Sequence, residues 1–463
     1  MNKKISFLAM FCAIAFMFLA FSFSVFAAGK KTTTAYNPIL SGDFADPCIL
    51  QHNDTFFIYA TAWDSKDAIV WYSTDFSGWK MRKLNWPNTK LADVIWAPCV
   101  VKGKDGRFYL YSSTGHNIYV GAAEHPLGPF KNLIANEQPL VKNREYWNDI
   151  HSIDADCFID DDGQAYLYYG SGHDWKNGKC AVGRLNDDMC SFKEAPRLVT
   201  PANYFEAPHM MKRNDTYFLM YSDGICIEDS YKVRYATSKS PLGPFVEGKN
   251  SPILTNTPDS LSWSSGHHYT IRLGAKDYIV YHKQAIPIYS PFWGPIRQVA
   301  FDEMQVNADG TIESVVVTRN GVDRNFLKNK KIQIPLSVSK ASSSATMGKN
   351  YDASKAFDNH NGTLWAAPTG KPAWIKADLG KVKKISSVIP VFDIIDGDYD
   401  YVIECSTDNK NWAEYAKAKN NRGNEWPVEL HKFVKARYIR LTILKQTKEP
   451  KRIGLWELKI FGK

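Results

Sequence analysis

Two runs of apolar residues joined by a short polar turn recur five times in the first two thirds of the chain. Each unit starts with a polar or proline-containing stretch, continues through an apolar strand, turns, and returns through a strand rich in aromatic residues. Apolar strands on either side of an Asn-Asp, Asp-Gly or Ala-Lys-Asp turn predict β-hairpins. The five predicted hairpins cover residues 44–61, 96–113, 152–172, 205–224 and 265–283.

The spacing of these hairpins indicates a radial repeat. They follow one another at intervals of about 50 residues, which is at the upper end of the range for propeller blades. The pentapeptide PLGPF occurs at 126–130 and again at 241–245, after an outer strand in two of the predicted blades. This recurring turn supports the repeat independently. We therefore predict a five-bladed β-propeller over residues 35–325, with the starts of the first strands converging on one axis.

The pattern changes near residue 325. Residues 326–344 are basic and then rich in serine, without a hairpin pattern, and we predict a linker there. Beyond it, short apolar strands alternate with polar turns, and no long helix is indicated. Residues 345–463 are therefore predicted to form a β-sandwich, and the whole chain is predicted to be all-β.

The N-terminal residues are typical of a secretion signal. Two lysines precede an apolar run over residues 5–20, and Val25 and Ala27 offer a cleavage site. We predict a signal peptide over residues 1–27 and a secreted protein. A permanent membrane anchor is the less favoured alternative, because the run does not end at a basic stop. No other segment of the sequence is apolar enough to span a bilayer once the signal is removed.

The charge and the cysteines restrict the kinds of partner and site. The formal charge of +9 falls to +7 when the signal and its two lysines are removed, and no basic block occurs. A nucleic-acid partner is therefore not expected. Seven cysteines remain, without a CxxC pair, so neither a disulfide framework nor a zinc site is expected. Cys180 and Cys190 are the one pair for which a bridge is considered.

Three of the five hairpins carry a carboxylate at the start of the first strand, namely Asp46, Asp154 and Glu206, and a fourth carries His267. Cleaving a glycosidic bond needs one protonated carboxyl group for the leaving oxygen and one ionised carboxylate that activates water or attacks carbon. Side chains from different blades would meet at the axis, where a third carboxylate raises the acid's pKa by like-charge repulsion. A hub of this kind would supply both conditions for cleaving a glycosidic bond.

In these motifs the chain resembles glycoside hydrolase family 43, the five-bladed propeller glycosidases. The resemblance extends from about residue 37 to residue 320. The matching motifs are ADP at 45–47, WAP at 96–98, ID at 153–154 with FIDDDG at 158–163, EAP at 206–208 and GH at 266–267. It implies an inverting enzyme that releases terminal sugars from polysaccharide or oligosaccharide and needs no cofactor for the chemistry. We expect the enzyme to be a monomer.

The resemblance implies a role for each of the three carboxylates. Asp46 is the implied general base, Glu206 the implied general acid, and Asp154 the group that tunes the pKa of the acid and orients the substrate. The family usually has proline after the second aspartate, where this chain has Ala155. That difference leaves the carboxylate in place.

Three further residues are implied to contact the substrate: Trp96, Arg297 and His267. Trp96 could also pack between blades. His267 matches a central histidine that in many members supports a bound metal ion, usually calcium, through water. We therefore also consider a structural calcium ion at the propeller centre.

The C-terminal segment resembles a discoidin-like (coagulation factor 5/8 type C) sandwich, as found in family 32 carbohydrate-binding modules. The matching stretches are KAFDNHNGTLWAA at 355–367, WIKADLG at 374–380, STDNKNW at 406–412, ARYIRL at 436–441 and ELKIFG at 457–462. Such a module would keep the catalytic domain close to an insoluble glycan and so raise its effective concentration there.

The favoured activity is that of an α-L-arabinofuranosidase. The resembled family also contains β-xylosidases, β-galactofuranosidases and galactosidases, and the sequence does not separate them. A protein of another class, which binds glycans for adhesion without cleaving them, is the remaining alternative. The three carboxylates argue against it, because a binding protein does not need a pair of carboxyl groups in opposite protonation states.

Overall fold

The structure is a computed structural model that describes residues 34–463 except 64, 88–93, 173–174, 260, 291–293, 328–333, 396, 420–424 and 448–451. The predicted signal peptide and part of the predicted linker lie outside these residues. The regular secondary structure of these residues is almost entirely β-strand, with four short 3-10 helices: η1 (Ala135–Glu137), η3 (Arg324–Phe326), η4 (Lys349–Tyr351) and η5 (Ala353–Ala356). None of their helices is long and apolar enough to cross a membrane.

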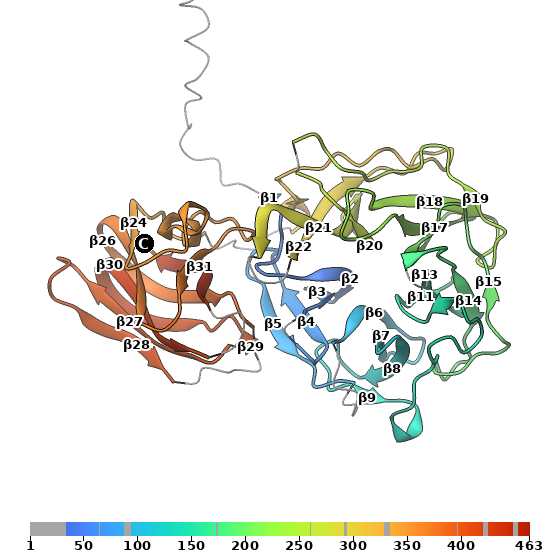
Figure 1. Cartoon of the computed structure of the whole chain (residues 1–463), viewed down its shortest axis with the longest axis horizontal. Coiled ribbons are helices and arrows are strands. Elements are labelled where there is room, and N and C mark those ends of the chain that lie inside the picture. Colours follow the sequence, from blue (N-terminus) through green and yellow to red (C-terminus); the bar gives the residue numbers. More distant parts are fainter. Residues whose placement is uncertain are drawn as a thin grey trace, which may run out of the picture. The chain divides into compact units, whose positions relative to one another are not determined.

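Five antiparallel sheets surround a common axis, which confirms the five-bladed propeller (Figure 1). Blade one contains β2 (Ala45–His52), β3 (Thr55–Thr61), β4 (Ile69–Ser73) and β5 (Lys80–Lys83). Blade two contains β6 (Trp96–Lys102), β7 (Phe108–Thr114), β8 (Asn117–Ala123) and β9 (Lys131–Asn132). Blade three contains β11 (Asp156–Ile159), β12 (Ala165–Tyr169), β14 (Ala181–Arg184) and β15 (Arg197–Leu198).

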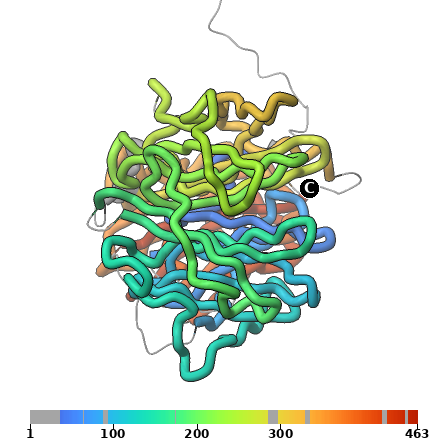
Figure 2. Tube along the Cα trace, turned by 90° about the vertical axis from the view of Figure 1, so that its right-hand side faces the viewer, coloured from blue at the N-terminus to red at the C-terminus, as the bar shows by residue number. Residues whose placement is uncertain are grey.

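Blade four contains β16 (Glu206–Arg213), β17 (Thr216–Asp223), β18 (Lys232–Ser238) and β19 (Val246–Glu247). Blade five contains β20 (Gly266–Leu273), β21 (Lys276–Ser290) and β22 (Gly294–Met304). Blades three and four, coloured green, lie side by side in both views (Figures 1 and 2). The first two long strands of each blade are the predicted hairpin. They bury apolar and aromatic side chains between neighbouring blades, and Tyr59, Tyr111, Tyr168 and Tyr221 are almost fully buried.

The segment that follows the predicted signal closes the ring beside blade five. The backbone N–H groups of Ile39 and Phe44 donate to the carbonyls of Val299 and Arg297 in β22, each at 2.9 Å. Two short strands, β1 (Thr34–Ala35) and β23 (Val322–Asp323), pair at the same junction. The segment from the start of the propeller therefore lies along β22, the last strand of blade five.

This closure differs from the expected one. At the end of blade five, the Asp-Gly dipeptide at 309–310 predicts a turn between two strands. In the structure, β22 ends before this turn, and an isolated bridge between Val306 and Ile312 takes the place of the second strand. The N-terminal segment occupies the edge of β22 that a further strand would otherwise use.

The C-terminal residues fold into an antiparallel β-sandwich, as predicted. Its seven strands are β24 (Lys340–Ser343), β25 (Trp365–Pro368), β26 (Ala373–Phe392), β27 (Tyr399–Ser406), β28 (Ala413–Ala418), β30 (Leu430–Gln446) and β31 (Arg452–Gly462). β24 pairs with β26, although residues 340–343 were expected in the linker. Leu336, Val338 and Ala341 pack against the sandwich core, which holds this serine-rich stretch in the sheet.

The propeller and the sandwich share buried contacts. β29 (Glu425–Trp426) comes from the C-terminal part of the chain and pairs with β5 of blade one. Trp71 of blade one and Trp456 of the sandwich belong to the same apolar cluster, and Trp71 meets Trp426 edge-on at 5.3 Å. Residues Thr34–Lys463 accordingly form one compact unit. The seven cysteines in it are free thiols, so Cys180 and Cys190 are not bridged.

Candidate active site

Each blade begins with a backbone turn in the left-handed region. The five residues in this conformation are Asp46, Ala97, Asp154, Ala207 and His267, with φ of 51°, 45°, 58°, 56° and 40°. Non-glycine residues rarely adopt such angles, which cost about 1–3 kcal/mol and gather at functional sites. In four of the five blades a break in strand register follows directly. Bulges of this kind redirect side chains, here toward the hub of the propeller.

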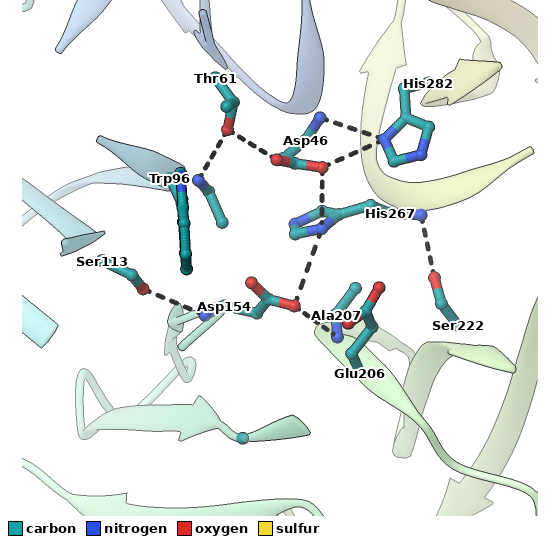
Figure 3. Close-up of polar contacts among 12 residues, drawn as sticks. Asp46, Thr61, Trp96, Ser113, Asp154, Glu206, Ala207, Ser222, His267 and His282 are labelled. Carbon is teal, nitrogen blue, oxygen red and sulfur yellow. Dashed lines mark hydrogen bonds and ion pairs between the residues drawn. The ribbon is translucent and has the colours of Figure 1, made fainter. Parts of the chain in front are cut away.

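In four of the blades, the N–H of the turn residue donates a hydrogen bond to a side chain of the preceding blade. Each acceptor lies on the second strand of its blade, where it pairs with the residue before the turn of that same blade. The four N–H donors and their acceptors are Ala97 to Thr61 Oγ1 (2.9 Å), Asp154 to Ser113 Oγ (3.2 Å), His267 to Ser222 Oγ (2.9 Å) and Asp46 to His282 Nδ1 (3.2 Å). Figure 3 shows these contacts around the hub.

The third blade departs from this arrangement. In blade three, the position of these acceptors is occupied by Gly170. Its N–H donates to the carbonyl of Ile153, and it has no side chain that could accept a hydrogen bond. The N–H of Ala207 in blade four therefore donates to Oδ2 of Asp154 instead, at 3.2 Å (Figure 3). The absence of a side chain at Gly170 thus leaves a backbone donor that fixes the carboxylate of Asp154.

Asp46 is buried within a set of polar partners. Its Oδ1 lies 3.2 Å from Arg297 Nη1, 3.2 Å from His267 Nδ1 and 3.1 Å from His282 Nδ1, and its Oδ2 accepts from the hydroxyl of Thr61 at 2.6 Å. Burial works to raise the pKa of Asp46, but Arg297 and then the two histidines outweigh it and hold this pKa well below its usual range. Asp46 is therefore ionised at neutral pH.

The pKa values of Asp154 and Glu206 are both raised. Burial, then the charges of Glu206 and Asp46, raise the pKa of Asp154 well above its usual value. Burial also raises the pKa of Glu206 to about 7, although the hydroxyl of Tyr231 donates to its Oε1 at 2.8 Å. Repulsion between like charges is mutual, so two carboxyl groups in one buried site do not both ionise. The site therefore combines an ionised carboxylate with a carboxyl group that can give a proton.

The structure places all six predicted site residues at or beside this hub. Trp96 lies at the start of β6, and its ring faces the hub in Figure 3. The guanidinium of Arg297 contacts Asp46 and lies over the ring of Trp63, with 5.3 Å to the ring centroid. Trp63 also meets Trp96 edge-on at 6.1 Å. Arg297 is thus the cation that keeps Asp46 ionised.

Sequence reasoning missed His282, Thr61, Tyr231 and Trp63. His282 and Thr61 could have been found from the repeat, because each pairs with the residue just before the turn of its own hairpin. Tyr231 and Trp63 come from loops that follow second strands, where no periodic pattern distinguishes them. Their contribution depends on contacts between blades, which a single hairpin does not reveal.

A metal ion bound directly by side chains is not indicated. Calcium prefers several oxygen ligands. Within the part of the chain that the structure describes, no group of three or more His, Cys, Asp or Glu side chains is placed to hold a metal ion. His267 uses its Nδ1 on Asp46 at 3.2 Å and lies 3.8 Å from Asp154. An ion that His267 supports through water stays a prediction.

Comparison with known proteins decides the family. Residues 35–312 match the model of the glycosyl hydrolases family 43, and residues 339–458 match the F5/8 type C domain. The chain belongs to glycosyl hydrolase family 43. This family 43 protein is therefore a glycoside hydrolase that needs no cofactor for catalysis, and the alternative of a non-catalytic glycan-binding protein is set aside.

Relatives of this family 43 enzyme include several kinds of glycosidase. A β-D-galactofuranosidase of Aspergillus niger is 30% identical over 66% of this chain and 92% of its own length. A xylosidase/arabinosidase of Bacteroides ovatus is 27% identical over 62% of this chain and 98% of its own length. A solved structure described as a glycoside hydrolase has a TM-score of 0.78 and 26% identity, and covers 94% of this chain and all of its own.

Proposed function

We propose that this family 43 enzyme releases terminal α-L-arabinofuranosyl residues from polysaccharide or oligosaccharide with inversion at the anomeric carbon. The observation that carries the mechanism is that carboxyl groups from three blades meet at one hub, where the pKa of Asp46 is lowered and those of Asp154 and Glu206 are raised. The sugar is supported by relatives, among them the Bacteroides ovatus xylosidase/arabinosidase and an arabinoxylan arabinofuranohydrolase of Bacillus subtilis, 26% identical over 65% of this chain and 68% of its own length.

In the proposed mechanism, Glu206 gives its proton to the leaving oxygen while Asp46 takes a proton from the water that attacks the anomeric carbon. The low pKa of Asp46 keeps it unprotonated for this role, and the raised pKa of Glu206 keeps a proton available. The N–H of Ala207 fixes the carboxylate of Asp154, which faces the substrate. A negative charge on Asp154 disfavours ionisation of Glu206. Trp96, Arg297 and His267 contact the sugar beside these groups.

A β-D-galactofuranosidase is the second candidate, and the Aspergillus niger relative favours it. Both candidate substrates present a five-membered ring, and the galactofuranosyl group carries one more exocyclic carbon. The two activities therefore differ in the room they need beside the ring.

The test compares kcat/KM on aryl α-L-arabinofuranoside, β-D-xyloside and β-D-galactofuranoside. The proposal predicts the highest value on the arabinofuranoside. A higher value on the galactofuranoside would replace the favoured substrate by the second candidate, and turnover of none of the three would contradict both.

We also propose that the enzyme is secreted and that residues 1–27 are its signal peptide. The support is the basic start and apolar run of the sequence. A relative from Cellvibrio japonicus, 26% identical over 52% of this chain and 78% of its own length, is named as extracellular. Sequencing the N-terminus of the exported protein tests this directly, because cleavage near residue 27 is expected and retention of residues 1–27 would contradict it.

The pH dependence should be bell-shaped. We expect kcat/KM to fall as the pH rises through about 7, because Glu206 loses its proton, and to fall in acid, where Asp46 gains one. Arg297 lowers the pKa of both groups, so Arg297→Gln should move both limbs to higher pH. Arg272→Gln, at an exposed ion pair of the same blade, is the control and should leave both limbs in place. An acid limb that does not move in Arg297→Gln would contradict the role of Asp46.

A further inference from the structure

A second exposed tryptophan, Trp175, packs on the residue that precedes Glu206. Trp175 is 53% exposed, and its ring is nearly parallel to that of Phe205, with 6.3 Å between the ring centroids and an angle of 13° between the planes. Phe205 is buried and directly precedes Glu206. A large aromatic surface is therefore exposed against the residue that precedes Glu206.

Two glycines near Trp175 allow the chain to approach Phe205 closely. A Cβ on Gly172 would come within 2.6 Å of the Phe205 ring, and one on Gly178 within 2.2 Å of its carbonyl oxygen. Both positions therefore require glycine for this close approach. The segment leaves blade three at Gly170, whose N–H bonds the carbonyl of Ile153 just before Asp154. The loop thus starts beside the hub and carries the indole of Trp175 over Phe205.

The exposed tryptophans Trp63 and Trp175 are associated with different catalytic carboxyl groups. Trp63, 51% exposed, packs on Arg297, which contacts Asp46, the carboxylate on the side of the attacking water. Trp175 packs on Phe205, next to Glu206. A general acid must lie within hydrogen-bond reach of the leaving oxygen, so the sugar attached to that oxygen lies on the side of Glu206.

We infer that Trp175, backed by Phe205, is the platform for the sugar on the leaving-group side of the scissile bond. The ligand is the pyranose or furanose ring that remains after the terminal sugar is released, and the C–H face of that ring stacks on the indole. Trp175 is thus a binding residue for the rest of the substrate, and neither Glu206 nor Asp46 depends on it. This inference rests on the proposed role of Glu206 as general acid.

The experiment compares two substrates with the same terminal sugar. An oligosaccharide has a sugar as its leaving group, whereas the corresponding glycosyl fluoride has none. Trp175→Ala should lower kcat/KM on the oligosaccharide by about tenfold, since an aromatic stacking contact contributes up to about 1.5 kcal/mol. It should leave kcat/KM on the glycosyl fluoride unchanged, and Trp175→Phe should restore most of the loss on the oligosaccharide.

Trp412→Ala is the matched control, because Trp412 lies in the sandwich, where its ring stacks under Arg440. It should leave both substrates unaffected, and the melting temperature of each variant checks that the fold is intact. Equal losses by Trp175→Ala on both substrates, or no loss on either, would overturn the inference while the proposed function stands. A wild-type enzyme that cleaves neither substrate would overturn the proposed function and the inference with it.

Discussion

Replacing Glu206 by glutamine is expected to lower kcat/KM on an oligosaccharide by about 10²- to 10⁴-fold, the usual contribution of a general acid. Glutamine has the same shape, and its carbonyl oxygen can still accept the hydroxyl of Tyr231, which donates to Glu206 at 2.8 Å. Its amide cannot give a proton to the leaving oxygen. The rates of wild type and variant are measured on the oligosaccharide and on an aryl glycoside whose phenolate leaves without protonation.

The loss should be much smaller on the aryl glycoside, because that leaving group needs no proton. Glu228→Gln is the matched control, since Glu228 lies exposed in the loop that follows β17. It should leave both rates unchanged. A loss by Glu206→Gln that is equally large on the two substrates would assign Glu206 to a step other than protonation of the leaving group.

Replacing Asp46 by asparagine should lower kcat by about 10²- to 10⁴-fold on both substrates alike. The attacking water has to lose a proton whatever the leaving group is, so an activated leaving group gives no rescue. The substitution also leaves the buried guanidinium of Arg297 without its carboxylate, 3.2 Å away in the wild type. Breaking a buried ion pair costs about 3–5 kcal/mol, so we also expect a lower melting temperature.

The fold of the Asp46 variant therefore has to be checked at the assay temperature by circular dichroism. Asp54→Asn, at the turn between β2 and β3, is the control at the other end of the same hairpin and should keep full activity. A folded Asp46→Asn protein that retains wild-type turnover would show that Asp46 does not activate the water.

The hairpins, the five blades and the meeting of Asp46, Asp154 and Glu206 could be predicted from the sequence, because they depend on local patterns that repeat. The position of the general acid relative to the turn could not be predicted. Asp46 and Asp154 occupy the left-handed turn itself, whereas in blade four that place belongs to Ala207 and Glu206 comes one residue earlier. A bulge shifts the register by one residue, and the alternation of apolar and polar positions does not show on which residue it falls.

Contacts between distant parts of the chain could not be predicted from the sequence either. The N-terminal segment bonds to β22, and β29 pairs with β5, across more than 250 and 300 residues respectively. Such pairings are decided by which exposed strand edge the folded blades leave open. Trp63 and Trp175 lie in irregular loops, so only their contacts with Arg297 and Phe205 reveal on which side of the hub they stand.

The stereochemistry of the first-formed sugar tests the central claim most directly. Proton NMR during cleavage of whichever aryl glycoside the enzyme accepts identifies the anomer released before mutarotation. The account predicts the inverted anomer, because Asp46 acts on water and forms no bond to the sugar. Release of the retained anomer would require a covalent intermediate on Asp46 and would contradict the mechanism proposed for these three carboxylates.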